Sequence, residues 1–197
     1  MKSISKIIGF AAFILMLATI MIFSACSANI AEGGIPCSCG KNHIMVSWTL
    51  DGKGNLDIQQ NEKPSDCTTW YQFTIGGTGY GQWEEFVNAH KNDVVNATVG
   101  MINKIQYNGS SNYSLFGGMP NLKTVRFAAG QQINRNWGKG IFEGCTNLES
   151  VTFGSDKFVP GLIDLSGADI TNNFAVYTFK NCEKIKRVVI PASVSEI

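Results

Sequence analysis

Three segments in the second half of the chain share one pattern of apolar residues. They begin at Phe116, Phe142 and Phe179, and each follows the form F-x-x-[CM]-x-x-[LI]-x-x-V-x-[FI]. Apolar residues three apart predict a tight turn with one side facing inward, and the closing V-x-[FI] alternates as a short strand does. One such turn cannot bury its apolar side alone, whereas stacked turns can, so the pattern predicts a β-rich solenoid. The expected repeat core consists of Phe116, Leu122, Val125, Phe127, Phe142, Cys145, Leu148, Val151, Phe153, Phe179, Cys182, Ile185, Val188 and Ile190.

These residues resemble the BspA-type leucine-rich repeat family of bacterial surface proteins, whose repeat runs F-x-G-C-x-x-L-x-x-[IV]-x-[IF]-P and then S-V-x-x-I. The second copy, from Phe142, matches the start of that pattern, and residues 190–197 match its end, whereas Met119 stands where the family has cysteine. A further likeness, to the family's N-terminal module, covers residues 39–79 with an insertion around Cys67. The resemblance implies a short leucine-rich repeat stack and adhesion to host matrix proteins or to other bacteria.

Residues 1–25 have the composition of an export signal. Two lysines precede an uncharged apolar run over residues 7–23, and small residues follow it; this order is typical of a secretory signal peptide. Ser24-Ala25-Cys26 resembles a bacterial lipobox, in which the chain is cut before a cysteine that carries lipid. We therefore expect lipidation of Cys26 and a lipid anchor that holds the exported chain at the cell envelope or surface. Cleavage after Ala28 and a retained membrane segment are the alternatives.

Between this leader and the repeats, local patterns predict a small β-rich cap. Residues 44–50 and 56–58 alternate around an Asp51-Gly52 turn, which predicts a hairpin. Apolar residues at helical spacing predict a short helix over 82–90, and residues 94–107 are expected to form a further strand pair or a weak first repeat. The expected organisation is a signal peptide over 1–25, a β-rich module over 26–110 and repeats over 111–197.

The segment between the second and third copies is longer than the one before it. Residues 158–174 are expected to hold either a longer loop or a degenerate extra turn around residues 162–165. At the other end of the repeats, the family pattern would continue beyond Ile197. We expect either a truncated reading frame or pairing of this end with another chain, because an uncapped turn leaves apolar surface exposed.

The six cysteines fall into three groups. Cys26 is the lipidation candidate. Cys145 and Cys182 occupy the same position of the repeat, where the first copy has Met119, and this equivalence favours burial over thiol chemistry. The remaining three, Cys37, Cys39 and Cys67, are expected to include a disulfide between Cys67 and one of the other two, because an export signal favours oxidation.

The same three cysteines are also candidate metal ligands. With His43 they could hold zinc tetrahedrally. A C-x-C pair followed by a histidine is weak ligand spacing, however, so we expect a disulfide rather than a metal site, with free thiols as the remaining alternative.

The sequence offers few residues or motifs for catalysis. Neither G-x-S-x-G nor H-E-x-x-H occurs, and only His43 and His90 could serve as a histidine base, so we expect neither an enzyme nor a cofactor. A formal net charge of +1 argues against nucleic acid as a partner.

A binding surface is the remaining prospect. Stacked strands would align their outward residues into a ladder, which is the usual recognition surface of solenoids; its expected members are Thr124, Arg126, Ser150, Thr152 and Arg187. A merely solvated face is the alternative, and the loop around Trp137 is a second candidate surface. The sequence thus predicts a non-catalytic surface lipoprotein that binds a protein ligand. The alternatives are a structural envelope lipoprotein without a specific ligand and an exported zinc or thiol protein.

Overall fold

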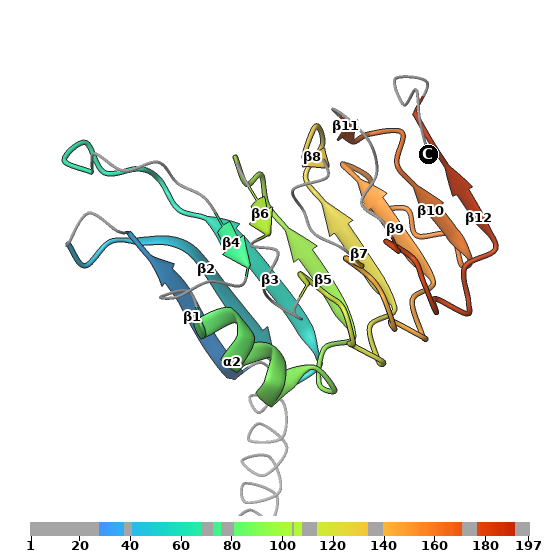
Figure 1. Cartoon of the computed structure of the whole chain (residues 1–197), viewed down its shortest axis with the longest axis horizontal. Helices are drawn as coiled ribbons and strands as arrows, with labels where there is room; N and C mark the ends of the chain where they lie inside the picture. The colour runs from blue at the N-terminus through green and yellow to red at the C-terminus, as the bar shows by residue number, and fades with distance from the viewer. Residues whose placement is uncertain are drawn as a thin grey trace, which may run out of the picture.

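A single eight-stranded sheet runs through the described part of the chain, in the order β1-β2-β3-β5-β7-β9-β10-β12 (Figure 1). The computed structural model describes residues 28–37, 41–67, 73–75, 81–103, 105–107, 114–133, 140–170 and 177–191. The strands of the sheet are β1 (Asn29–Pro36), β2 (Ile44–Asp51), β3 (Asn55–Gln60), β5 (Asn96–Val99), β7 (Thr124–Phe127), β9 (Ser150–Phe153), β10 (Leu162–Asp164) and β12 (Arg187–Val189). The sheet crosses the expected boundary at residue 110 without interruption.

The pairing of neighbouring strands changes once along the sheet, from antiparallel to parallel. β1, β2 and β3 pair antiparallel, which confirms the hairpin predicted around Asp51-Gly52. From β3 onward every neighbouring pair is parallel. β5 lies between β3 and β7, so residues 96–99 take the position of a repeat strand instead of pairing with residues 105–107. The described residues also contain two small parallel pairs: β4 (Phe73–Ile75) with β6 (Ile105–Tyr107), and β8 (Gln132–Ile133) with β11 (Asp169–Ile170).

The three sequence copies occupy equivalent positions in space. Each contributes its V-x-[FI] segment to the sheet, as β7, β9 and β12. The leading phenylalanines stack face to face, with ring centroids 5.6 Å apart for Phe116 and Phe142 and 5.6 Å apart for Phe142 and Phe179. The closing phenylalanines of the first two copies, Phe127 and Phe153, also stack at 4.8 Å. This regular apolar stacking explains why the pattern recurs in the sequence.

An additional strand separates the second and third copies. β10 pairs in parallel with β9 on one side and with β12 on the other. Of the two expectations for residues 158–174, the extra turn around residues 162–165 is therefore confirmed. Its Ile163 is fully buried, as are the central valines of β7 and β9.

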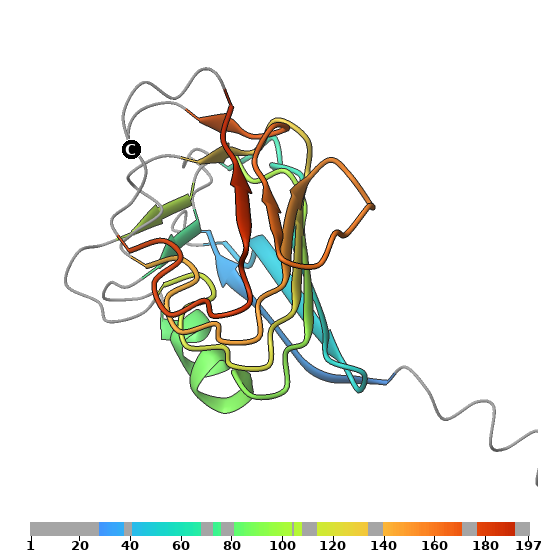
Figure 2. The same ribbon diagram turned by 90° about the vertical axis from the view of Figure 1, so that its right-hand side faces the viewer.

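A short helix and an aromatic cluster cover the core at the antiparallel end. α2 (Gly81–His90) confirms the predicted helix and packs against β1. Trp83 of this helix meets Trp48 of β2 edge to face, with centroids 5.1 Å apart, and stacks on Phe86 at 5.1 Å. In Figure 2 the helix lies on one side of the sheet, and the opposite side faces away from it.

The end of the sheet at β12 is less covered. The third copy is therefore less buried than the expected repeat core requires. Val188 and Ile190 are each 37% exposed, and Phe179, Cys182 and Ile185 are only partly buried. β12 is the last strand of the sheet, and in the described residues it pairs on one side only. The motif places these side chains correctly, but burial also requires a neighbouring turn on both sides.

Candidate functional site

The sheet face opposite α2 carries a continuous row of hydrogen-bonded polar side chains. The Asp51 carboxylate accepts hydrogen bonds from the backbone N–H and the side-chain amide of Asn55, each at 2.8 Å. Asn96 donates to the Asn55 amide oxygen at 3.0 Å, and the Thr124 hydroxyl donates to the Asn96 amide oxygen at 2.7 Å. Because each member binds the next, the row is preorganised across β3, β5 and β7.

The expected ladder of outward residues is wrong at β9, the strand of the second copy. Ser150 and Thr152 are buried, although they point away from the core. The connection between β9 and β10 protrudes on this side of the sheet (Figure 2), and the Thr152 hydroxyl donates to the Ser155 carbonyl at 2.8 Å. Gly154 and Gly161, both at positive φ, stand at the two ends of this connection. The β9–β10 loop, which the strand pattern does not predict, therefore covers Ser150 and Thr152.

The same loop forms one wall of a hollow over Thr124 and Arg126 of β7. Asp156 forms an ion pair with Arg126, and Phe158 is 42% exposed. The hollow encloses about 450 Å³ and is lined by Asn55, Asn96, Ala97, Thr98, Thr124, Arg126, Asp156 and Phe158. Its floor comes from three strands and its wall from the loop, so amide, hydroxyl, charged and aromatic groups converge on one space.

Arg187 lies apart from this hollow. It is exposed on β12, and β10 places Leu162 between Arg187 and Ser150 in the register of the sheet. The polar row is thus interrupted by an apolar residue, and Arg187 does not continue it. Of the five expected ladder residues, the structure brings only Thr124 and Arg126 into the hollow.

Sequence reasoning missed the N-terminal half of the row. Asn55 and Asn96 lie outside the three copies, yet each begins a strand in which an outward polar residue alternates with an inward apolar one. Residues 55–58 and 96–99 share this alternation with residues 124–127. Aligning these four-residue strands, rather than the whole motif, would have extended the ladder to β3 and β5.

The contacts of Cys145 and Cys182, the two repeat cysteines, indicate a structural role. The Cys145 thiol donates to the Phe116 carbonyl at 3.0 Å, and the Cys182 thiol donates in the same way to the Phe142 carbonyl at 3.0 Å. Burial raises the pKa of the Cys145 thiol to about 12 and that of Cys182 to about 11. Both groups remain protonated near neutral pH, so neither is an activated nucleophile.

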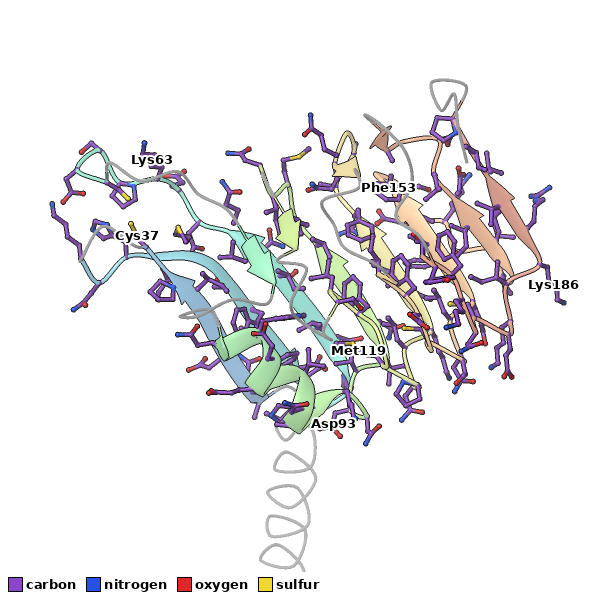
Figure 3. All side chains as sticks on the ribbon, in the orientation of Figure 1. Cys37, Lys63, Asp93, Met119, Phe153 and Lys186 are labelled. Atoms are coloured by element: carbon purple, nitrogen blue, oxygen red, sulfur yellow. The ribbon has the colours of Figure 1, made fainter. Side chains whose placement is uncertain are left out.

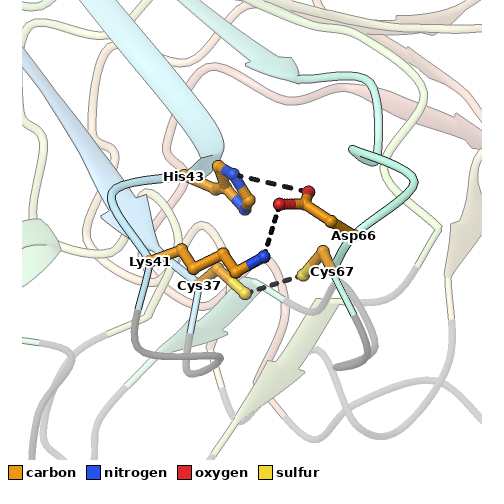
Figure 4. Close-up of polar contacts among 5 residues, drawn as sticks. All are labelled: Cys37, Lys41, His43, Asp66 and Cys67. Atoms are coloured by element: carbon orange, nitrogen blue, oxygen red, sulfur yellow. Dashed lines mark hydrogen bonds and ion pairs between the residues drawn. The ribbon is translucent and has the colours of Figure 1, made fainter.

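A second cluster of reactive side chains lies far from the hollow, where β1 ends and β2 begins. Figure 3 places Cys37 at the opposite end of the sheet from Lys186. The sulfur atoms of Cys37 and Cys67 are 2.8 Å apart, and the His43 imidazole lies beside them (Figure 4). One ligand atom from each of these three residues falls within 4.8 Å of the others. The structure therefore brings Cys67 to Cys37, although the disulfide itself stays a prediction.

Two loops are joined at this cluster. The Cys37 N–H donates to the His43 carbonyl at 2.7 Å, which closes the connection from β1 to β2. Asp66 forms an ion pair with Lys41, and its Oδ1 lies 3.7 Å from His43 Nε2 (Figure 4). The hydrogen bond from Lys41 lowers the pKa of the Asp66 carboxyl, so this group stays ionised beside the imidazole.

Some expectations fall outside the described residues. They concern the signal peptide over 1–25, the lipidation candidate Cys26, the third cysteine Cys39 and the loop around Trp137. Across the ranges that are described, no helix has the length and apolar character needed to cross a membrane. Comparison with family models, with curated proteins and with solved structures found no match to this chain.

Proposed function

We propose that this protein is an exported, lipid-anchored surface protein whose leucine-rich repeats form a short solenoid of the BspA type and bind a protein ligand. The stacked phenylalanines at 5.6 Å and the shared parallel sheet support the solenoid, because equivalent residues recur at equivalent positions. The leader and Ser24-Ala25-Cys26 support the lipid anchor. Binding is non-catalytic and needs no cofactor.

The hollow beside Arg126 is the observation that carries the binding role. Interface centres are enriched in aromatic residues and arginine, and the hollow offers both beside a row of hydrogen-bonding groups. The row is held by its own hydrogen bonds, so little side-chain entropy is lost when a ligand docks. Each of the Asn55 and Asn96 side-chain amides uses one N–H within the row, so an extended segment of a protein ligand can accept from the second N–H of each and pack against Phe158.

The test is binding of the purified protein to a panel of matrix proteins and whole bacterial cells. Arg126→Ala and Phe158→Ala are expected to weaken binding at least tenfold each, because truncation of a residue at the energetic centre of an interface costs about 2 kcal/mol or more. Lys91→Ala is the matched control, because Lys91 is exposed directly after α2, on the other side of the sheet.

The outcomes separate the candidate roles. Saturable binding that both variants lose and the control keeps supports the binding role and locates its face. Binding that persists in both variants contradicts the assignment to the hollow. A folded protein that binds no member of the panel favours a structural envelope lipoprotein without a specific ligand.

A further inference from the structure

The cluster at Cys37, His43 and Cys67 offers more than a pair of thiols. A disulfide needs only the two sulfur atoms, but here an imidazole nitrogen lies within 4.8 Å of both. Two thiolates and an imidazole are ligands that Zn²⁺ prefers. Cys37 and Cys67 are 6% and 3% exposed, whereas His43 is only partly buried, so the cluster is closed on one side and open on the other.

The geometry requires little movement to accept an ion. With Zn–S bonds of about 2.3 Å in tetrahedral coordination, two thiolate sulfurs lie about 3.8 Å apart. The Cys37 and Cys67 sulfurs, now 2.8 Å apart, need to separate by about 1 Å. Cys37 directly follows β1 and Cys67 belongs to the connection between β3 and β4, so neither lies within a strand and this shift does not disturb the sheet.

The surrounding charges favour the same occupant. Zn²⁺ with two thiolates is neutral, which permits burial without an uncompensated charge. The nearby Asp66 and Lys41 form an ion pair that is itself neutral. Asp66 also faces His43 Nε2, in the manner of a carboxylate that orients a metal-bound imidazole.

We propose that Cys37, His43 and Cys67 bind one Zn²⁺ ion when the two thiols are reduced, with Asp66 as a positioning residue. Binding displaces the thiol protons, and water takes the fourth position, since the described residues supply three ligands. The site is independent of the hollow over β5 and β7. It is exclusive with a Cys37–Cys67 disulfide, because the same sulfurs cannot serve both.

The experiment uses the purified protein, reduced and freed of metal, and measures Zn²⁺ stoichiometry and the visible spectrum with Co²⁺ in its place. One ion per chain and intense thiolate-to-cobalt absorption are expected. Cys37→Ser and Cys67→Ser should each abolish that absorption, and His43→Ala should weaken Zn²⁺ binding at least tenfold. Asp66→Asn should weaken it about tenfold, as loss of an orienting partner does. Cys182→Ser is the matched control and should bind as the unaltered protein does.

A second arm uses oxidised glutathione, which converts the two thiols to a disulfide and is itself reduced to two glutathione thiols. The oxidised protein should lose the site. If a cysteine variant fails to fold, as judged by circular dichroism, His43→Ala decides, because His43 is partly exposed at a loop end. A reduced, folded protein that binds no stoichiometric ion overturns the proposal, as does a Zn²⁺ affinity that is unchanged in His43→Ala.

Discussion

The second and third copies of the repeat have the same motif but different surroundings. Phe142 has a phenylalanine stacked on each side, at 5.6 Å and 5.6 Å, whereas Phe179 stacks on Phe142. Val151 is fully buried, and its counterpart Val188 is 37% exposed. The difference shows that the motif decides which side chains face inward, while the neighbouring turns decide how completely they are buried.

The largest difference between the two copies is expected when the stacked phenylalanines are truncated. Phe142→Ala is expected to lower the free energy of unfolding by about 4 kcal/mol, since it leaves a cavity inside a stack of three rings. Phe179→Ala should cost about half as much, because Phe179 is only partly buried. Chemical denaturation of both variants measures the two values, and equal losses would contradict the comparison.

The valines provide a test with identical chemistry at both sites. Val151→Ala is expected to lower the free energy of unfolding by about 2 kcal/mol, through lost burial and a small cavity. Val188→Ala, in the last strand of the sheet, should lower the free energy of unfolding by less than about 1 kcal/mol. Thermal and urea unfolding can measure this. A cost at Val188 as large as that at Val151 would show that β12 is covered by residues outside the described part.

The cysteines of the two copies make the free energy of unfolding depend on pH to different extents. In the folded protein the Cys145 pKa is raised to about 12 from an ordinary value of 9.0, so its thiol binds a proton more tightly folded than unfolded. This contribution to stability is complete below pH 9 and is lost as the pH rises towards 12. Between pH 8 and pH 10 the loss from this one thiol should be about 1 kcal/mol.

Replacement of the thiol provides the control for that measurement. Cys145→Ala should make the unfolding free energy less dependent on pH in this window, and Cys182→Ala should do so to a smaller extent, because the Cys182 pKa is about 11. Thiol alkylation at pH 8 should likewise modify Cys182 before Cys145. Faster alkylation of Cys145 would show that its burial is not as tight as the structure indicates.

Much of the fold was predictable from local patterns. The hairpin around Asp51-Gly52 and the helix over 82–90 follow from local signals in the sequence, whereas the extra turn around residues 162–165 was one of two interpretations of its segment. These elements have short-range causes: a turn dipeptide, a helical period and a repeated triplet spacing. The inward direction of the repeat core has the same origin.

The candidate sites were only partly predictable. Thr124 and Arg126 face the hollow as the alternation requires, but the burial of Ser150 and Thr152 depends on a loop that folds back over its own strand. The approach of Cys67 to Cys37 joins residues 30 positions apart in the chain, and no spacing rule selects that pair over one with Cys39.

Sequence alone determined the period of the repeat and the inward or outward direction of each strand residue, because both follow from backbone geometry within a few residues. The accessibility of the outward residues, the depth at which the third copy is buried and the approach of Cys67 to Cys37 follow from the tertiary structure. These properties depend on contacts between segments far apart in the chain. Such contacts are set by the packing of the whole sheet rather than by any local pattern.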